Sequence, residues 1–367
     1  MRDYILKRIL LMFPTLFFIT VISFSISRMA PGDPAELKAG VSQGGEMSTG
    51  KGSDLNEQIV QLIRKQWNLD KPIFYFTFLE EQDDENPRSF FSRLTFIWNG
   101  AQNQYHIWTS KIFHLDFGNS FRDNQPVIEK LKDRVPVTLM LSSISVFLSY
   151  LIAIPLGIFS AVKSNTIFER ISTFIVFMLY SLPSFWVGIM LIIFFGGGDF
   201  FDVFPYAGLH SNTYEVMSGF EKFKDIIWHI AMPVFVMTYG SFAYLSRQMR
   251  TGMLEIIRQD YIRTARAKGL SNRVVIFKHA LRNSIIPIIT ILAGLLPYLI
   301  GGSIIIETIF SIPGMGSLGF EAITGRDYPI VMAVFTISAV LTLVGILLSD
   351  LAYSFVDPRI TFEKSTK

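Results

Sequence analysis

The sequence predicts an all-α membrane protein with six transmembrane helices. Hydrophobic residues make up 50% of the 367 residues and charged residues only 17%, with a mean hydropathy of +0.40, whereas soluble domains carry about 25% charged residues. A helix needs about 20 apolar residues to cross a bilayer core. Six segments of about that length contain no Asp, Glu, Lys or Arg: residues 9–27, 136–162, 171–195, 226–246, 285–306 and 330–349.

The first apolar segment, residues 9–27, follows Arg2, Lys7 and Arg8, as the apolar region of a signal peptide would. It is longer than that region usually is, and the following "SRMAPGD" offers a poor cleavage site with small residues. We therefore expect residues 1–29 to form a retained N-terminal anchor.

The distribution of basic residues predicts the orientation. If six spans are drawn, the basic loops all fall on one side of the membrane, and short basic loops are cytoplasmic. The loop after the fourth span carries nine Lys or Arg residues against Glu255 and Asp260, whereas the loop at 198–225 is acidic. Both termini and the segment 247–284 are therefore predicted to be cytoplasmic.

The long first loop, residues 30–135, is then predicted to be an extracytoplasmic insert. Its Gly/Ser-rich part predicts a flexible stretch, and "LNEQIVQLIRKQWNLDKP" predicts an amphipathic helix with Ile59, Leu62, Ile63 and Trp67 on one stripe. The remaining chain divides into a five-helix core at 136–357, which includes the segment 247–284, and a cytoplasmic tail at 358–367.

The stretch "GEMSTGKG" at 45–52 nearly matches a phosphate-binding loop. Gly52 stands where the magnesium-binding hydroxyl belongs, no apolar strand precedes the stretch, and no helix pattern follows at once. We therefore interpret it as a loop and predict that the chain has no ATP site of its own.

Other chemistry finds little support in the composition. The absence of cysteine excludes disulfides and thiolate sites, and the five histidines lie too far apart for a metal site. We expect neither a metal nor a cofactor bound by this chain. The net charge of +3 gives no support to nucleic-acid binding.

The segment 247–284 has the pattern of two helices joined at a glycine. Met253, Ile256, Ile257, Tyr261 and Ala265 form an apolar stripe along a helix that reaches Lys268. Gly269 suits the left-handed residue that ends a helix, and Leu270 can pack back against that helix. Ser271 or Asn272 can cap the next helix.

Two interpretations of this segment follow. Basic helices commonly rest on anionic lipid headgroups. The small residues Ala265 and Ala267 before Gly269 favour a protein docking site, because they let another surface approach the backbone closely.

The same residues carry a resemblance to a known family. "YIRTARAKGLSNRVVIFKHALRNSIIP" resembles the cytoplasmic coupling loop of permease subunits in ATP-binding cassette importers of the oligopeptide/dipeptide class. The general pattern is Glu-Ala-Ala, three residues, Gly, nine residues and Ile-x-Leu-Pro. Here Arg263 replaces the Glu and Arg282 the final Pro, departures that are typical of the peptide class.

The resemblance covers most of the chain. "NLDKPIF", "DFGNSF" and "VPVTLMLS" resemble the approach to the second span of that class, and "IETIFSIPGMGSLGFEAITGRDYPIV" its last external loop. "DLAYSFVDPRI" is similar to its C-terminal end. "FFGGGDFFDVFPYAGL" is similar to the Yej-type subgroup, which has a longer first loop.

The resemblance implies a type I ABC importer permease fold and a non-catalytic subunit of a peptide importer in the bacterial inner membrane. The implied partners are a second homologous permease, two cytoplasmic ATPases that use ATP and magnesium, an extracytoplasmic peptide-binding protein, and membrane lipids. The implied docking residues are Asp260, Tyr261, Arg263, Thr264, Ala265, Ala267, Lys268, Gly269, Leu270 and Ser271.

Alternatives remain at this point. Some relatives of this class move nickel or sugars. An ion-coupled carrier would place ionisable residues inside its spans, and these spans contain none. A membrane-anchored enzyme would need a nucleophile and a base in one site, and the external loop offers only scattered His106, His114 and carboxylates.

Overall fold

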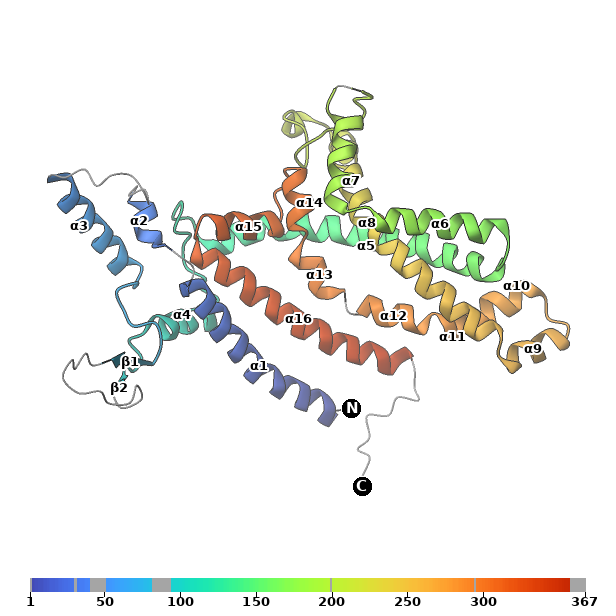
Figure 1. Ribbon diagram of the computed structural model, residues 1–367, viewed down its shortest axis with the longest axis horizontal. Coiled ribbons are helices and arrows are strands. Elements are labelled where there is room, and N and C mark those ends of the chain that lie inside the picture. The colour runs from blue at the N-terminus through green and yellow to red at the C-terminus, as the bar shows by residue number, and fades with distance from the viewer. Residues whose placement is uncertain are drawn as a thin grey trace. The chain divides into compact units, whose positions relative to one another are not determined.

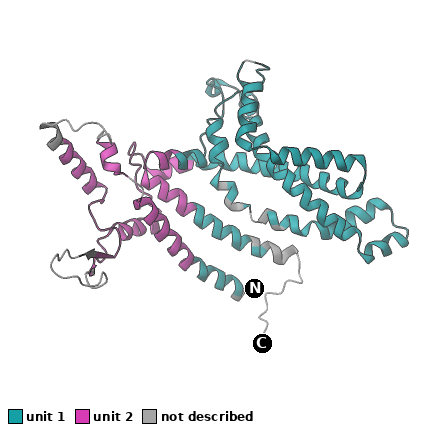
Figure 2. Ribbon diagram, viewed as in Figure 1, with its two compact units in different colours: residues 1–12, 133–320, 338–367 teal, residues 13–132, 321–337 magenta. Residues whose placement is uncertain are grey.

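The computed structural model describes residues 2–29, 32–39, 51–80, 94–198, 200–293 and 295–356. Those residues are mostly helical and include one two-stranded antiparallel hairpin (Figure 1). The predicted Gly/Ser-rich stretch, except for its last residues, and the cytoplasmic tail lie outside the described residues. The chain divides into two compact units: residues 1–12, 133–320 and 338–367 form unit 1, and residues 13–132 and 321–337 form unit 2 (Figure 2).

The elements follow one another in this order: α1 (Arg2–Met29), α2 (Pro34–Lys38), α3 (Lys51–Gln66), β1 (Phe76–Glu80), β2 (Leu94–Trp98), α4 (Gln104–Phe113), α5 (Val127–Val162), α6 (Ile167–Ser181), α7 (Ser184–Leu191), η2 (Ile192–Gly196), η3 (Tyr214–Val216), α8 (Gly219–Ile257), α9 (Asp260–Ala267), α10 (Asn272–Val274), η4 (Val275–Ala280), α11 (Leu281–Ser284), α12 (Ile286–Ala293), α13 (Leu296–Gly301), α14 (Ile304–Ile309), α15 (Met315–Thr324) and α16 (Tyr328–Val356).

Four helices of the described chain are long and apolar enough to cross a membrane: α1, α5, α8 and α16. The helices α6 and α7 with η2 add a fifth span if they are counted together, although they meet at a bend of 93°. The bend falls where Pro183 precedes Ser184, and proline is well suited to begin a new helix. The expected span at 171–195 is therefore helical but sharply bent.

The expected span at 285–306 is not one continuous helix. It consists of α12, α13 and the start of α14. Gly302, which separates α13 from α14, has φ +68, a left-handed conformation that interrupts a right-handed helix. The apolar composition of this segment does not indicate where glycine lets the backbone turn.

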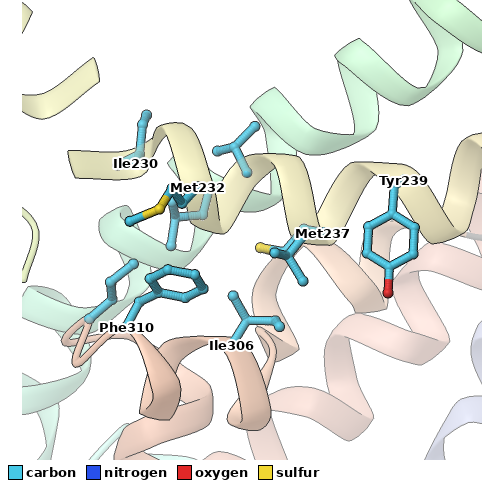
Figure 3. Close-up of a cluster of buried hydrophobic side chains, with 10 residues drawn as sticks. Ile230, Met232, Met237, Tyr239, Ile306 and Phe310 are labelled. Carbon is cyan, nitrogen blue, oxygen red and sulfur yellow. The ribbon is translucent and has the colours of Figure 1, made fainter. Parts of the chain in front are cut away.

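The interior of unit 1 is built on α5 and α8. One buried cluster joins Leu141 of α5 to Ile230, Met232 and Met237 of α8 and to Phe310 beyond α14 (Figure 3). Because Ile230 and Met232 lie on opposite sides of α8, this helix is buried on more than one side here, as in packed interiors. The α8 helix begins with a capping box, in which Ser218 and Glu221 exchange hydrogen bonds and satisfy backbone N–H groups.

Unit 2 has its own aromatic core. Phe24, Tyr105 and Met332 are buried together, and Trp108 packs against them. The expected amphipathic helix is present as α3, but Val60 is its buried residue, whereas Leu62 remains 67% exposed. The expected stripe is therefore wrong in detail. Trp67 lies just beyond α3, and its ring stacks on Phe121 at a centroid distance of 3.9 Å.

The position of α3 contradicts one of the reasons for rejecting residues 45–52 as a phosphate-binding loop. This helix begins at Lys51, so a helix does follow at once, contrary to the expectation from sequence. The absence of a Ser or Thr after Lys51 still removes the hydroxyl that a magnesium-nucleotide loop needs.

Candidate functional site

The segment 247–284 leaves the core at the end of α8. The sequence predicted one helix as far as Lys268, but α8 ends at Ile257 and a new helix, α9, begins at Asp260. Gln259 between them is extended, with φ −70 and ψ 150, and its carbonyl accepts from the N–H groups of Ile262 and Arg263. Tertiary packing overrides the helical pattern at this point.

The break changes which side chains of α9 are buried. Ile262 is fully buried, whereas Tyr261, which the continuous helix placed on the apolar stripe, is 43% exposed. Ile262 lies in a cluster with Met249 and Met253 of α8 and Val275 of η4. The helix α9 is thus packed against its own chain through Ile262.

Ala265 belongs to the same buried cluster and is only 8% exposed. The sequence had suggested that Ala265 and Ala267 both let a foreign surface approach. Ala265 instead faces the interior, where a small side chain fits between packed helices, and only Ala267 is exposed. The small-residue argument therefore holds for Ala267 and is wrong for Ala265.

The turn at Gly269 has the expected conformation. Its φ of +79 is left-handed. Its N–H donates to the Arg266 carbonyl at 3.0 Å, and the N–H of Leu270 donates to the Ala265 carbonyl at 3.4 Å. This pair of bonds is the Schellman arrangement that ends helices. An added Cβ on Gly269 would meet nothing within 4 Å, so the outer side of the turn is open.

Leu270, which the sequence placed against α9, is 41% exposed and is not among the side chains packed against the Ile262 cluster. One further expectation about this turn is corrected. Ser271 occupies the N-cap position of α10 with extended backbone, but its side chain makes no capping hydrogen bond. The backbone bond from Val275 N–H to the Ser271 carbonyl, at 3.0 Å, starts the next helix instead.

Arg266 and nine further residues of α9 and the following turn are exposed. The nine are those that the sequence singled out, and we call them the outward face. It comprises Asp260, Tyr261, Arg263, Thr264, Ala267, Lys268, Gly269, Leu270 and Ser271. Nine of the ten residues that the sequence singled out thus lie exposed on consecutive turns, and Ala265 lies behind them. The pair Arg263–Asp260 is almost fully exposed and contributes little to stability.

The outward face is fixed to the rest of unit 1. The amide of Asn283 donates to the Tyr261 hydroxyl at 2.8 Å, joining α9 to α11. Gly252 of α8 lies against α11, because an added Cβ would come within 3.1 Å of the Ser284 carbonyl oxygen. A force applied to α9 is therefore transmitted to α8 through packed backbone rather than through a loose loop.

Close packing continues from α8 to α5 and α6. A Cβ added to Gly157 of α5 would lie 2.6 Å from the Cβ of Met249, so the two helices touch at this glycine. Arg250 of α8 binds Glu169 of α6 at 2.7 Å. The outward face, α8 and the neighbouring helices form one continuous packed assembly.

The structure reveals one polar centre that the sequence had not singled out. Glu307 of α14 is 1% exposed. Its Oε1 accepts from Thr138 Oγ1 at 3.1 Å and Ser303 N–H at 3.3 Å, and its Oε2 accepts from Ser317 N–H at 2.8 Å. Burial raises the pKa of this carboxyl group, and these hydrogen bonds oppose the shift.

Glycines make room for that carboxyl group. A Cβ added to Gly314 would lie 2.4 Å from the Glu307 Cδ, and one added to Gly302 would lie 2.3 Å from its Oε1. The sequence signal was present as a single acid among apolar residues, flanked by Gly302, Gly314 and Gly316. The arrangement ties α14 and the turn before α15 to Thr138 of α5.

None of the described residues forms a His, Asp or Glu cluster that could hold a metal ion. The arrangement of the segment 247–284 instead suits a protein contact: a short amphipathic helix and a glycine turn, exposed on one side and packed on the other.

Comparison with known proteins identifies the family. Residues 153–362 match the family "Binding-protein-dependent transport system inner membrane component". The chain belongs to this family. The matched range includes the whole of α9, the Gly269 turn and Glu307.

Relatives that align over nearly their whole length support the same family. The chain is 34% identical to the peptidoglycan transport system permease protein YejB of Agrobacterium fabrum, over 99% of each chain. It is 36% identical to the oligopeptide transport system permease protein AppB of Bacillus subtilis, over 99% of this chain and 100% of the relative. A solved structure of the MetNI methionine ABC transporter, inward facing, matches with a TM-score of 0.49 and 19% identity, over 63% of this chain and 97% of that chain.

Proposed function

We propose that this chain is the permease subunit of an ATP-driven importer that moves peptides across the bacterial inner membrane. The observation that carries the proposal is the family match combined with full-length similarity to permeases named for oligopeptide and peptidoglycan transport. Both names refer to substrates that contain peptide, namely oligopeptides and the peptide part of peptidoglycan. Transport of nickel finds no support in the names of these two relatives.

In this proposal the chain crosses the membrane six times and has both termini in the cytoplasm, as a type I importer permease does. The helices α1, α5, α8 and α16 each cross the membrane, and the bent unit of α6, α7 and η2 is a fifth span. The interrupted segment 285–306 is the sixth, because broken helices are tolerated at membrane depth where protein surrounds them. The first loop, 30–135, is an enlarged extracytoplasmic insert.

The outward face is the docking site for a cytoplasmic ATPase subunit. The exposed Gly269 turn lets a groove of the ATPase approach the backbone, and Ile262 holds α9 in place from behind. A second homologous permease completes the pathway, a second ATPase docks on it, and an extracytoplasmic binding protein delivers the peptide.

In this mechanism, ATP and magnesium bind only to the ATPase partners. Closure of the ATPases moves α9, and α8 transmits the movement because α9 and α8 share the Ile262 cluster. The cavity between the permeases then opens outward, and hydrolysis restores the inward state. The exposed cations of the outward face, Arg263 and Lys268, also lie near anionic headgroups, each contributing about 1 kcal/mol.

The test is uptake by the reconstituted transporter in liposomes with a binding protein present. The proposal is supported if peptide uptake requires ATP on the side of the membrane where the ATPases lie. Uptake should also persist when ionophores remove the ion gradients. Uptake that survives ATP depletion and stops when the proton gradient is removed would instead identify an ion-coupled carrier.

A further inference from the structure

Unit 2 contains a partly buried arginine that has no acidic partner among the described residues. Arg28, at the end of α1, forms no ion pair or hydrogen bond among the described residues, and its Nε is buried without any hydrogen-bond acceptor. Its guanidinium lies between two aromatic rings, 5.1 Å from the Phe24 centroid and 5.2 Å from the Tyr328 centroid. Aromatic faces attract a cation but do not accept its N–H bonds as a carboxylate does.

The neighbouring acid is already occupied. Asp33 acts on Arg28 electrostatically, but its Oδ2 accepts from Arg64 Nε at 2.6 Å. Its Oδ1 accepts from the Ala35 N–H at 2.7 Å, where it caps α2. Asp33 is therefore committed to holding α2 and α3 together, and no other acid of the part of unit 2 that the structure describes pairs with the guanidinium of Arg28.

A second unsatisfied group lies beside the same cavity. Gln104, only 8% exposed, donates its amide N–H groups to the carbonyls of Leu69 and Lys71, at 3.2 and 2.6 Å. These two bonds fix the orientation of the amide. Its Oε1 is left buried with no donor. A buried donor and a buried acceptor without partners each cost free energy, but solvent does not reach Gln104 Oε1, so the amide shapes the wall and does not contact a ligand.

Arg28 and Gln104 both line a cavity of about 700 Å³ within unit 2. The rest of its wall includes apolar side chains, among them Ile73, Phe74, Phe76 and Phe78. Lys71 adds a second cation, while Asp33 is the acid of this wall. The cavity therefore combines a site for an anion with an aromatic surface.

We infer that this cavity binds the carboxy-terminal end of a peptide. The terminal carboxylate pairs with the Arg28 guanidinium, and an apolar last side chain packs against Phe74 and Phe76. The inference rests on the proposed function, which places this loop on the side from which peptides arrive. It adds a substrate contact in the permease itself, selective for a free and apolar C-terminal residue.

The probe is radiolabelled Ala-Ala-Phe, compared with the same peptide carrying a C-terminal amide. Equilibrium binding is measured on the assembled transporter in lipid nanodiscs without nucleotide and without binding protein. The free acid is expected to bind at least about tenfold more tightly than the amide, which corresponds to about 1.4 kcal/mol. Equal affinities for the acid and the amide would overturn the inference.

Variants separate a ligand contact from a structural role. Arg28→Gln should lower affinity for the acid to that for the amide, and Arg28→Lys should restore part of the difference, because it keeps the charge but not the two-pronged geometry. The matched control Arg122→Gln changes an exposed arginine in the same unit and should bind as the unaltered protein does.

The unfolding temperature without peptide gives a further test, because it would fall in the Arg28 variant if Arg28 stabilised the fold. Removing a cation that has no partner should leave the unfolding temperature of Arg28→Gln unchanged or raised. A clear drop in that temperature, or unchanged acid binding by this variant, would overturn the inference. ATP-dependent peptide uptake by the unaltered transporter separates the two proposals. If only the peptide site in this cavity is wrong, uptake persists. If the proposed function is wrong, uptake is absent.

Discussion

Truncation of Ile262 tests how α9 is held. Ile262 is fully buried against Met249, Met253 and Val275, and it anchors a helix of only eight residues. An isolated helix of that length is not stable in water. Ile262→Ala should therefore loosen α9 without disturbing the spans.

The expected magnitude follows from burial. Truncation of a completely buried Ile to Ala typically costs about 2–5 kcal/mol. Because every 1.4 kcal/mol changes an equilibrium tenfold, local opening of α9 should become about 30-fold more frequent or greater. Loss of ATPase docking should accompany it, since the outward face would no longer be presented in one arrangement.

The assay is hydrogen exchange of the α9 amides, measured by mass spectrometry on the assembled transporter in nanodiscs. The matched control is Tyr261→Ala, which removes an exposed side chain and one hydrogen bond, from Asn283. It should weaken ATPase binding while changing exchange in α9 by much less. If Ile262→Ala left the exchange of α9 unchanged, or if both variants changed it equally, the packing explanation would be wrong.

Two predictions concern the remainder of unit 1. Gly314→Ala should lower stability by about 1–3 kcal/mol, since its Cβ would lie 2.4 Å from the Glu307 Cδ; thermal unfolding checks this, with Gly219→Ala, where the space is open, as a neutral control. Arg250→Gln and Glu169→Gln should each destabilise the protein, and their double variant should cost less than the sum by about 1 kcal/mol, because the two side chains form one ion pair; strict additivity would show that the pair contributes nothing.

The segment 247–284 shows what local patterns can and cannot predict. Gly269 was predictable, because a glycine between two helical patterns has few other roles and its left-handed φ follows from its lack of a side chain. The break at Gln259 was not predictable, because no glycine or proline lies beside it. Burial of Ile262 in place of Tyr261 depends on contacts with α8 and η4, which no local pattern contains.

The same distinction holds elsewhere in the chain. The apolar lengths of α1, α5, α8 and α16 were predictable from composition. The Glu307 centre was not, because its donors come from Thr138, Ser303 and Ser317, the first of which is 169 residues away along the chain. The lack of an ion pair at Arg28 among the described residues was likewise not predictable, because it depends on the hydrogen bond between Asp33 and Arg64.

The central claim is that an ATPase drives this permease through the outward face, and ATPase stimulation tests it most directly. Gly269→Asp places a charged side chain on the open turn, and Gly198→Asp makes the same change at a glycine with the same φ of +79 and equally open surroundings. ATP hydrolysis by the assembled transporter is measured with and without the peptide-loaded binding protein. The account predicts that Gly269→Asp abolishes the stimulation while Gly198→Asp retains it; normal stimulation in Gly269→Asp, at normal membrane insertion, would contradict the account.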